Sequence, residues 1–148
     1  MSTERNFSEE NWKKILSAIQ DAERNTSGEI RLFVEDTCKG EVLDRAAFIF
    51  RELKMHETKS RNGVLFYLAV KDHKFAILGD SGIHSTVHKD FWDDIKLEMQ
   101  NHLTAGDFVT ALSKGIHMAG EAMKKSFPFD KGDKNELSDE IIFGSNKE

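Results

Sequence analysis

The apolar residues in four stretches of the chain recur every three or four positions, the spacing that places side chains along one face of an α-helix. Ser8 comes directly before the first stretch, and its side chain favours a helix N-cap. The second stretch follows Gly40, the third begins around Val87, and the last begins at Asp107 in "AGDF". The predicted apolar faces are, in chain order, Trp12, Ile15, Leu16, Ile19 and Ala22; Leu43, Ala46, Ala47, Phe50 and Leu53; Phe91, Ile95, Met99 and Leu103; and Phe108, Ala111, Leu112, Ile116, Ala119 and Met123.

Three shorter stretches predict strands. The stretch "EIRLFVE" (29–35) alternates its aliphatic residues on one face, whereas "GVLFYLAV" (63–70) is apolar throughout, as in a central strand covered on both faces. The charged turn "KDHK" (71–74) leads into "FAIL" (75–78), an antiparallel partner. This order of helices and strands indicates an α/β sandwich in which the first two strands are parallel through a right-handed crossover. In the central strand we expect two buried faces: Leu65, Tyr67 and Ala69 on one, and Val64, Phe66, Leu68 and Val70 on the other.

The chain has 148 residues, enough for one well-packed domain and too few for two ordinary ones. We place this domain at residues 1–128 and predict that the mostly polar segment 129–148 is a tail. Within the tail, residues 131–135 offer no apolar side chain to bury, so we expect them to be mobile. The apolar "EIIFG" that follows is expected to dock on the domain through Ile141 and Phe143.

Composition and charge exclude several classes of protein. Acidic residues outnumber basic ones by 26 to 21, and the net charge of −5 argues against a general nucleic-acid binder, which needs a basic face. No apolar run approaches the roughly 18 residues of a membrane span, and the N-terminus lacks the apolar core of a signal peptide. Cys38 is the only cysteine, so no disulfide can form within the chain, and a cytoplasmic location is expected.

The stretch "GDSG" (79–82) resembles the segment that carries the nucleophile of chymotrypsin-like proteases. That fold needs two β-barrels, however, and this chain has about three strands. No histidine has an obvious carboxylate partner by motif, so a Ser-His-Asp triad on Ser81 is not indicated. We interpret the stretch as a turn that ends a strand, with Gly79 and Gly82 in unusual backbone conformations and Asp80 or Ser81 bonded to the local backbone.

Polar residues gather at the edge of the sheet where the two parallel strands begin. Glu29 opens the first strand, "RNG" (61–63) opens the second, and the antiparallel strand delivers "GDSG" (79–82) to the same edge. Carboxylates there suit Ca²⁺ or Mg²⁺, whereas Arg61 and glycine-flanked N–H groups suit phosphate oxygens. Asp107 joins this edge from the start of the last helix, or it is simply the N-cap of that helix.

The opposite edge, where parallel strands end, is where open α/β sheets usually bind ligands. Asp36 and Asp72 lie there, and both residues are also common in turns.

The order and spacing of these segments resemble the TPM-domain (TPM phosphatase) family. The matching segments are "SGEIRLFVE", "RNGVLFYLAVKDHKFAILGDSGI" and "AGDFVTALSKGI", and the likeness covers residues 8 to 127. The resemblance implies a three-layer α/β/α sandwich, a small mixed sheet with helices on both faces. It also implies hydrolysis of phosphate esters or nucleotide phosphates in some members, and binding of divalent cations in some. The Gly-Tyr/Phe-Gly turn of many members is replaced here by Asp80 and Ser81 between the glycines.

Together these observations predict a hydrolase of small phosphate esters or nucleotides that depends on Ca²⁺ or Mg²⁺, in which the cation activates a water molecule. The alternative is a non-catalytic module of the same fold that binds a cation or a partner protein. The expected cation ligands are Glu29, Asp80 and Asp107, of which the two aspartates are the catalytic candidates; the expected substrate-binding residues are Arg61, Asn62, Ser81 and Gly82.

Overall fold

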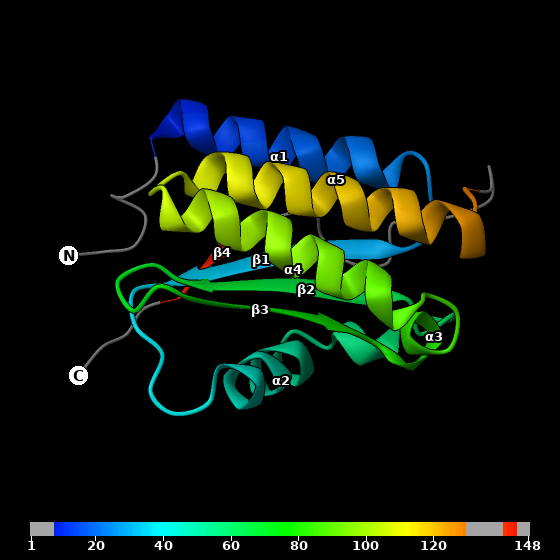
Figure 1. Cartoon of the computed structure of the whole chain (residues 1–148). Helices are drawn as coiled ribbons and strands as arrows, with labels where there is room; N and C mark the ends of the chain where they lie inside the picture. The colour runs from blue at the N-terminus through cyan, green and yellow to red at the C-terminus, as the bar shows by residue number, and fades with distance from the viewer. Residues whose placement is uncertain (1–7, 130–140, 145–148) are drawn as a thin grey trace.

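The computed structural model describes residues 8–129 and 141–144. These residues form one mixed four-stranded sheet with helices on both faces, so the predicted α/β sandwich is confirmed (Figure 1). The elements in chain order are α1 (Glu9–Glu23), β1 (Glu29–Glu35), α2 (Val42–Glu52), the short 3-10 helix η2 (Met55–Glu57), β2 (Gly63–Ala69), β3 (Lys74–Gly79), the single-turn helix α3 (Ser81–His84), α4 (Lys89–Thr104), α5 (Phe108–Ser126) and β4 (Ile141–Phe143).

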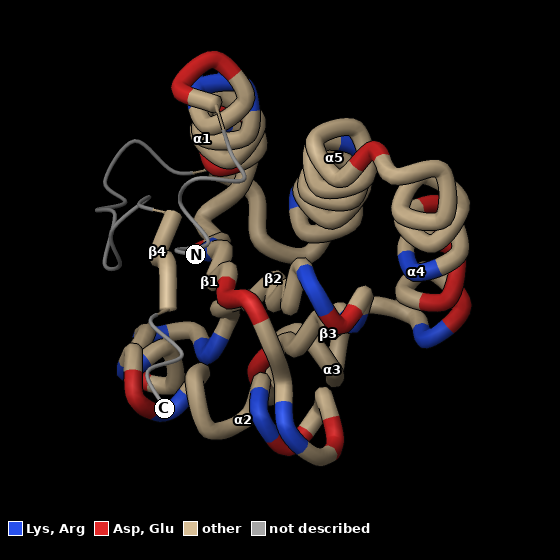
Figure 2. The backbone as a smooth tube through the Cα atoms, turned by 90° about the vertical axis from the view of Figure 1, so that its left-hand side faces the viewer, with Lys and Arg blue, Asp and Glu red and all other residues tan. Residues whose placement is uncertain are grey.

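The strands lie in the order β3-β2-β1-β4, so β3 and β4 are the two edges of the sheet. β1 runs parallel to β2 and to β4, whereas β2 and β3 form the predicted antiparallel hairpin. The helices α1, α5 and α4 cover one face and α2 covers the other, as the end view shows (Figure 2).

β2 is buried along its whole length, as expected of a strand between two helical layers. Its side chains alternate between two cores, with Phe66 on the α1/α4/α5 side and Tyr67 on the α2 side. The predicted division of the strand is therefore confirmed, except that Val70 lies just beyond the end of β2 and is only partly buried.

Ser8 caps α1 as predicted, because its hydroxyl accepts a hydrogen bond from the Asn11 N–H at 3.1 Å. The predicted face of α2 is wrong by part of a turn. Leu43 is 54% exposed, Ala47 is exposed as well, and Ile49 is buried instead. Two apolar stripes overlap on this helix, and the position of the single sheet beneath it decides which one is buried.

The docking of "EIIFG" is confirmed. Residues 141–143 add a fourth strand beside β1, and the Gly144 N–H donates to the Val34 carbonyl at 2.6 Å. The Phe143 ring meets Trp12 of α1 edge-on, with 5.4 Å between ring centroids. The mobility predicted for residues 131–135 concerns a segment outside the described residues.

Candidate functional site

The three polar segments predicted to meet at one edge of the sheet do so. Glu29 pairs with Gly63 at the start of the parallel strands, and Gly79 pairs with Val64 at the end of β3. The Asp80 N–H continues the ladder by donating to the Gly63 carbonyl at 2.9 Å.

An ion pair between Asp80 and Arg61 is the main electrostatic feature of this edge. Arg61 Nε donates to Asp80 Oδ2 at 2.7 Å and Nη2 donates to Oδ1 at 2.8 Å, a bidentate arrangement. The Asp80 side chain is 6% exposed, whereas that of Arg61 is 51% exposed. Burial raises the pKa of Asp80, but the hydrogen bonds from Arg61 and from the Ser81 N–H lower it by more, so the carboxylate stays ionised.

The turn after β3 differs from the prediction in its backbone. Asp80 caps α3 and accepts from the Ser81 N–H at 2.7 Å, so its predicted bond to the local backbone is confirmed. The unusual conformations predicted for Gly79 and Gly82 are wrong, because neither glycine has a positive φ. At residue 82 a glycine is needed because there is no room for a side chain. A Cβ there would lie 2.3 Å from the Ser60 carbonyl oxygen and 2.7 Å from that of Arg61.

A pocket of about 330 Å³ lies beside the ion pair, on the α2 side of the sheet. Three basic side chains line it, from α2, from η2 and from the loop before β2: Arg51, His56 and Arg61. Asp80 is the single carboxylate among the described residues of the lining, and Arg61 already neutralises its charge. The pocket therefore has a net positive lining in an acidic protein. No motif marked Arg51 or His56 in the sequence, because their place in the pocket depends on where α2 and η2 dock.

Of the other predicted substrate-binding residues, none lines this pocket. Asn62 is 2% exposed, and its carbonyl accepts from the Glu29 N–H at 3.2 Å. The side-chain Oδ1 of Asn62 is buried and has no hydrogen-bond partner among the described residues. Ser81 is exposed, and its assignment as a residue that is not a nucleophile stays a prediction.

Asp107 does not reach this edge. The other end of α5 does, because the Ser27 N–H donates to the carbonyl of Phe127 at 2.9 Å. α5 has 19 residues, so its first turn lies about 28 Å away at 1.5 Å per residue (Figure 1). Asp107 is the N-cap of α5, and hydrogen bonds from the Thr110 hydroxyl and N–H lower its pKa.

The predicted cation ligands therefore do not form a site. Glu29 is 3% exposed at the start of β1, Asp80 is held by Arg61, and Asp107 lies at the far end of α5. Within residues 8–129 and 141–144, no group of three or more histidine, cysteine or acidic side chains is arranged to hold a metal ion. The residues present do not fit a bound Ca²⁺ or Mg²⁺ at this edge.

At the opposite edge, the two aspartates act as turn residues. Asp72 Oδ2 accepts from the Cys38 N–H at 2.7 Å, and Asp36 lies 3.9 Å from the Lys71 ammonium. Both contacts join the loop after β1 to the hairpin after β2.

The comparisons with known proteins agree with this architecture. A family model of the TPM domain matches residues 2–122, which is most of the chain. The chain belongs to the TPM-domain family. The resemblance noted in the sequence is thereby confirmed.

Solved structures of proteins from several bacteria are similar to this chain. The NMR structure of the BA42 protein from the psychrophilic bacterium Bizionia argentinensis has a TM-score of 0.87 and 46% identity, covering 92% of this chain and 94% of that one. Two N-terminal domains share the fold at lower identity. That of the cg2496 protein from Corynebacterium glutamicum has a TM-score of 0.64 and 14% identity, covering 79% of this chain and 74% of that one. That of a protein from P. gingivalis has a TM-score of 0.67 and 15% identity, covering 82% and 78%.

Among curated proteins, none matches this TPM-domain chain. In the part of the chain that the structure describes, no helix is both long and apolar enough to cross a membrane.

Proposed function

We propose that the pocket beside the Arg61–Asp80 pair binds the phosphate group of a small ester or nucleotide, and that the protein hydrolyses that ester. The observation that carries the proposal is the joint lining of one pocket by Arg51, His56 and Arg61. A volume of about 330 Å³ suits a small molecule, and two guanidinium groups suit phosphate oxygens. The TPM domain, a family named for phosphatases, supports the same reaction class.

The proposed mechanism uses the side chains of the pocket in separate roles. Asp80 takes two of the five N–H donors of Arg61 and leaves the others for the ligand. Arg51 and Arg61 hold the phosphoryl oxygens and stabilise the charge that develops there. Water attacks phosphorus, the ester P–O bond breaks, and the leaving oxygen takes a proton from His56 of the lining, which regains one from the attacking water.

Asp80 is a positioning residue in this proposal. Its carboxylate is bonded to Arg61 and to the Ser81 N–H, so it orients the guanidinium rather than attacking the substrate. No step is assigned to a divalent cation, because the expected ligands lie apart. Dependence on Ca²⁺ or Mg²⁺ stays a prediction, and the assay below tests it.

The test is a panel of p-nitrophenyl phosphate and nucleotides, each measured without added metal, with Ca²⁺ and with Mg²⁺. We expect slow turnover by the wild type, and loss of most of it in Arg51→Gln and in His56→Gln. Ser81→Ala and Arg24→Gln, which alter side chains outside the pocket, serve as controls and retain activity. Absence of turnover under every condition rejects the hydrolase.

The second candidate is the non-catalytic module. It is favoured by the ion pair between Asp80 and Arg61. Because this pair occupies the carboxylate of the described lining, no free carboxylate is left there to act as a general base. Calorimetry with inorganic phosphate separates the candidates: binding that Arg51→Gln weakens, together with no turnover, identifies an anion-binding module. A partner protein that occupies this edge instead would leave phosphate without effect.

A further inference from the structure

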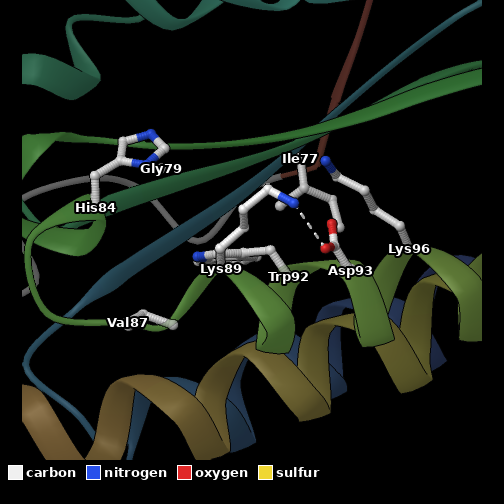
Figure 3. Close-up of a pocket in the computed structure, with 8 residues that line it drawn as sticks. All are labelled: Ile77, Gly79, His84, Val87, Lys89, Trp92, Asp93 and Lys96. Carbon is white, nitrogen blue, oxygen red and sulfur yellow. Dashed lines mark hydrogen bonds and ion pairs between the residues drawn. The ribbon is translucent and has the colours of Figure 1, made fainter.

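We infer that the protein has a second ligand site, across β3 from the first pocket, which binds a small organic anion with a flat apolar body. The site is a cavity of about 360 Å³ between the open edge of β3 and the first half of α4. Its lining consists of Ile77, Gly79, His84, Val87, Trp92 and a set of three charged side chains on α4, Lys89, Asp93 and Lys96 (Figure 3).

The Trp92 side chain is the strongest sign of a ligand. Its indole Nε1 is buried and has no hydrogen-bond partner among the described residues. A buried donor without an acceptor is costly in a native protein, and a small turn of the ring toward a ligand oxygen in the cavity would remove that cost. Figure 3 shows the Trp92 ring edge-on along the α4 side of the pocket, opposite Ile77 of β3.

The charges of the pocket favour an anion. Lys89, Asp93 and Lys96 are four or three residues apart on α4 and therefore share one face of the helix. The Lys89 ammonium lies 3.0 Å from Asp93 Oδ2, and this pair is drawn in Figure 3. Lys96 has no carboxylate within ion-pair distance among the described residues, so its charge is left for a ligand.

The edge of β3 contributes backbone groups to the same cavity. Asp80 and Gly63 are a hydrogen-bonded pair of the antiparallel ladder, and such pairs alternate along the strands. The N–H and C=O groups of Ile77 and Gly79 therefore point away from β2. Because β3 is the last strand on this side of the sheet formed by the described residues, no strand covers these groups.

The apolar residues of the lining indicate that the ligand also has an apolar body. Ile77 and Val87 are at least nine-tenths buried and belong to the main core, and Trp92 packs against that core. A bare inorganic anion would leave these surfaces in contact with water. A planar apolar body bearing one anionic group satisfies the indole donor, Lys96 and the apolar lining together.

The test follows the side-chain signal of Trp92 by ¹⁵N NMR in Trp12→Phe, which leaves one indole in the protein. The probe is 2-naphthoate, with 2-naphthalenemethanol as the uncharged match and inorganic phosphate as the anion without an apolar body. We expect saturable movement of the Trp92 indole N–H with 2-naphthoate, and affinities at least about tenfold weaker for the other two compounds.

Variants locate the site. Lys96→Gln should weaken 2-naphthoate binding about tenfold, whereas Lys13→Gln on exposed α1 and Arg51→Gln in the first pocket should leave it unchanged. Any of three results would overturn the inference. The Trp92 signal does not move, the alcohol binds as tightly as 2-naphthoate, or Lys96→Gln leaves the dissociation constant of 2-naphthoate unchanged. The spectra also report whether each variant is folded.

Discussion

Tyr67, the only tyrosine of the chain, belongs to a buried network at the ends of β1 and β2. Its hydroxyl donates to Oε2 of Glu35, whose side chain is 1% exposed. Arg45 of α2 donates to the same carboxylate through Nε at 2.8 Å and Nη2 at 2.9 Å. Burial first, and then the bond to Glu35, raise the pKa of Tyr67 above its ordinary value. The network ties α2 to the sheet.

This shift predicts a loss of stability in alkali. An unfolded tyrosine ionises near pH 10, whereas folded Tyr67 holds its proton beyond that pH. A raised folded pKa adds stability that is complete below about pH 10 and is lost as the pH rises further. We expect no tyrosinate absorbance from the native protein at pH 10 to 11, and a flatter stability profile in Tyr67→Phe. Tyrosinate that forms near pH 10 without unfolding would contradict the burial.

Asp80 gives the opposite dependence on pH. Its folded pKa is lowered, so the Arg61 pair contributes stability above the unfolded value of about 3.9 and loses it as the pH falls below that value. We expect Asp80→Asn to lower the free energy of urea unfolding at pH 7 and to reduce its fall toward pH 3. Asp94→Asn, at an exposed position of α4, is the control.

The sign of the Asp80→Asn effect also tests the predicted cation site. If Asp80 belonged to a cluster of carboxylates that repel one another, Asp80→Asn would make the metal-free protein more stable. Because Asp80 is paired with Arg61, we expect Asp80→Asn to lower the stability of the protein, with or without Ca²⁺ or Mg²⁺.

At the scale of elements, β2 is buried along its whole length because both of its faces are covered. Leu68 is 1% exposed, in the layer between the sheet and α1, α4 and α5. Leu68→Ala should therefore cost roughly 2–5 kcal/mol, as large-to-small core substitutions do. Leu97→Ala removes the same atoms from a side chain that is 63% exposed and should change stability by at most about 0.5 kcal/mol. Denaturant titrations of the two variants compare these costs directly.

At the scale of the whole molecule, the C-terminal strand completes the sheet. β4 pairs with β1 from Leu32 to Val34, and Ile141 is 6% exposed. A chain that ends at residue 129 loses this strand and exposes one edge of β1. Burial of one isoleucine is worth about 1.5–3 kcal/mol, so the melting temperature should fall by several degrees. A chain that ends at residue 144 keeps β4 and should melt like the full protein.

The sequence by itself determined the four long helices, the three longer strands and the pairing of those strands, because hydrophobic period and turn residues act locally. β1 has the predicted bounds, and the apolar run of β2 is the central strand that it was expected to be. The edge that joins Glu29, Asn62 and Asp80 also followed from strand direction alone.

Only the tertiary structure decided which side chains meet across elements. Asp107 could not be placed without the direction of α5, whose length separates it from the edge that Ser27 occupies. Arg51 and His56 reach the pocket, and Trp92 reaches β3, because of how α2, η2 and α4 dock against the sheet. The spacing of apolar residues predicts which face of a helix is buried only to within a fraction of a turn. It carries no information on where that helix lies along the sheet.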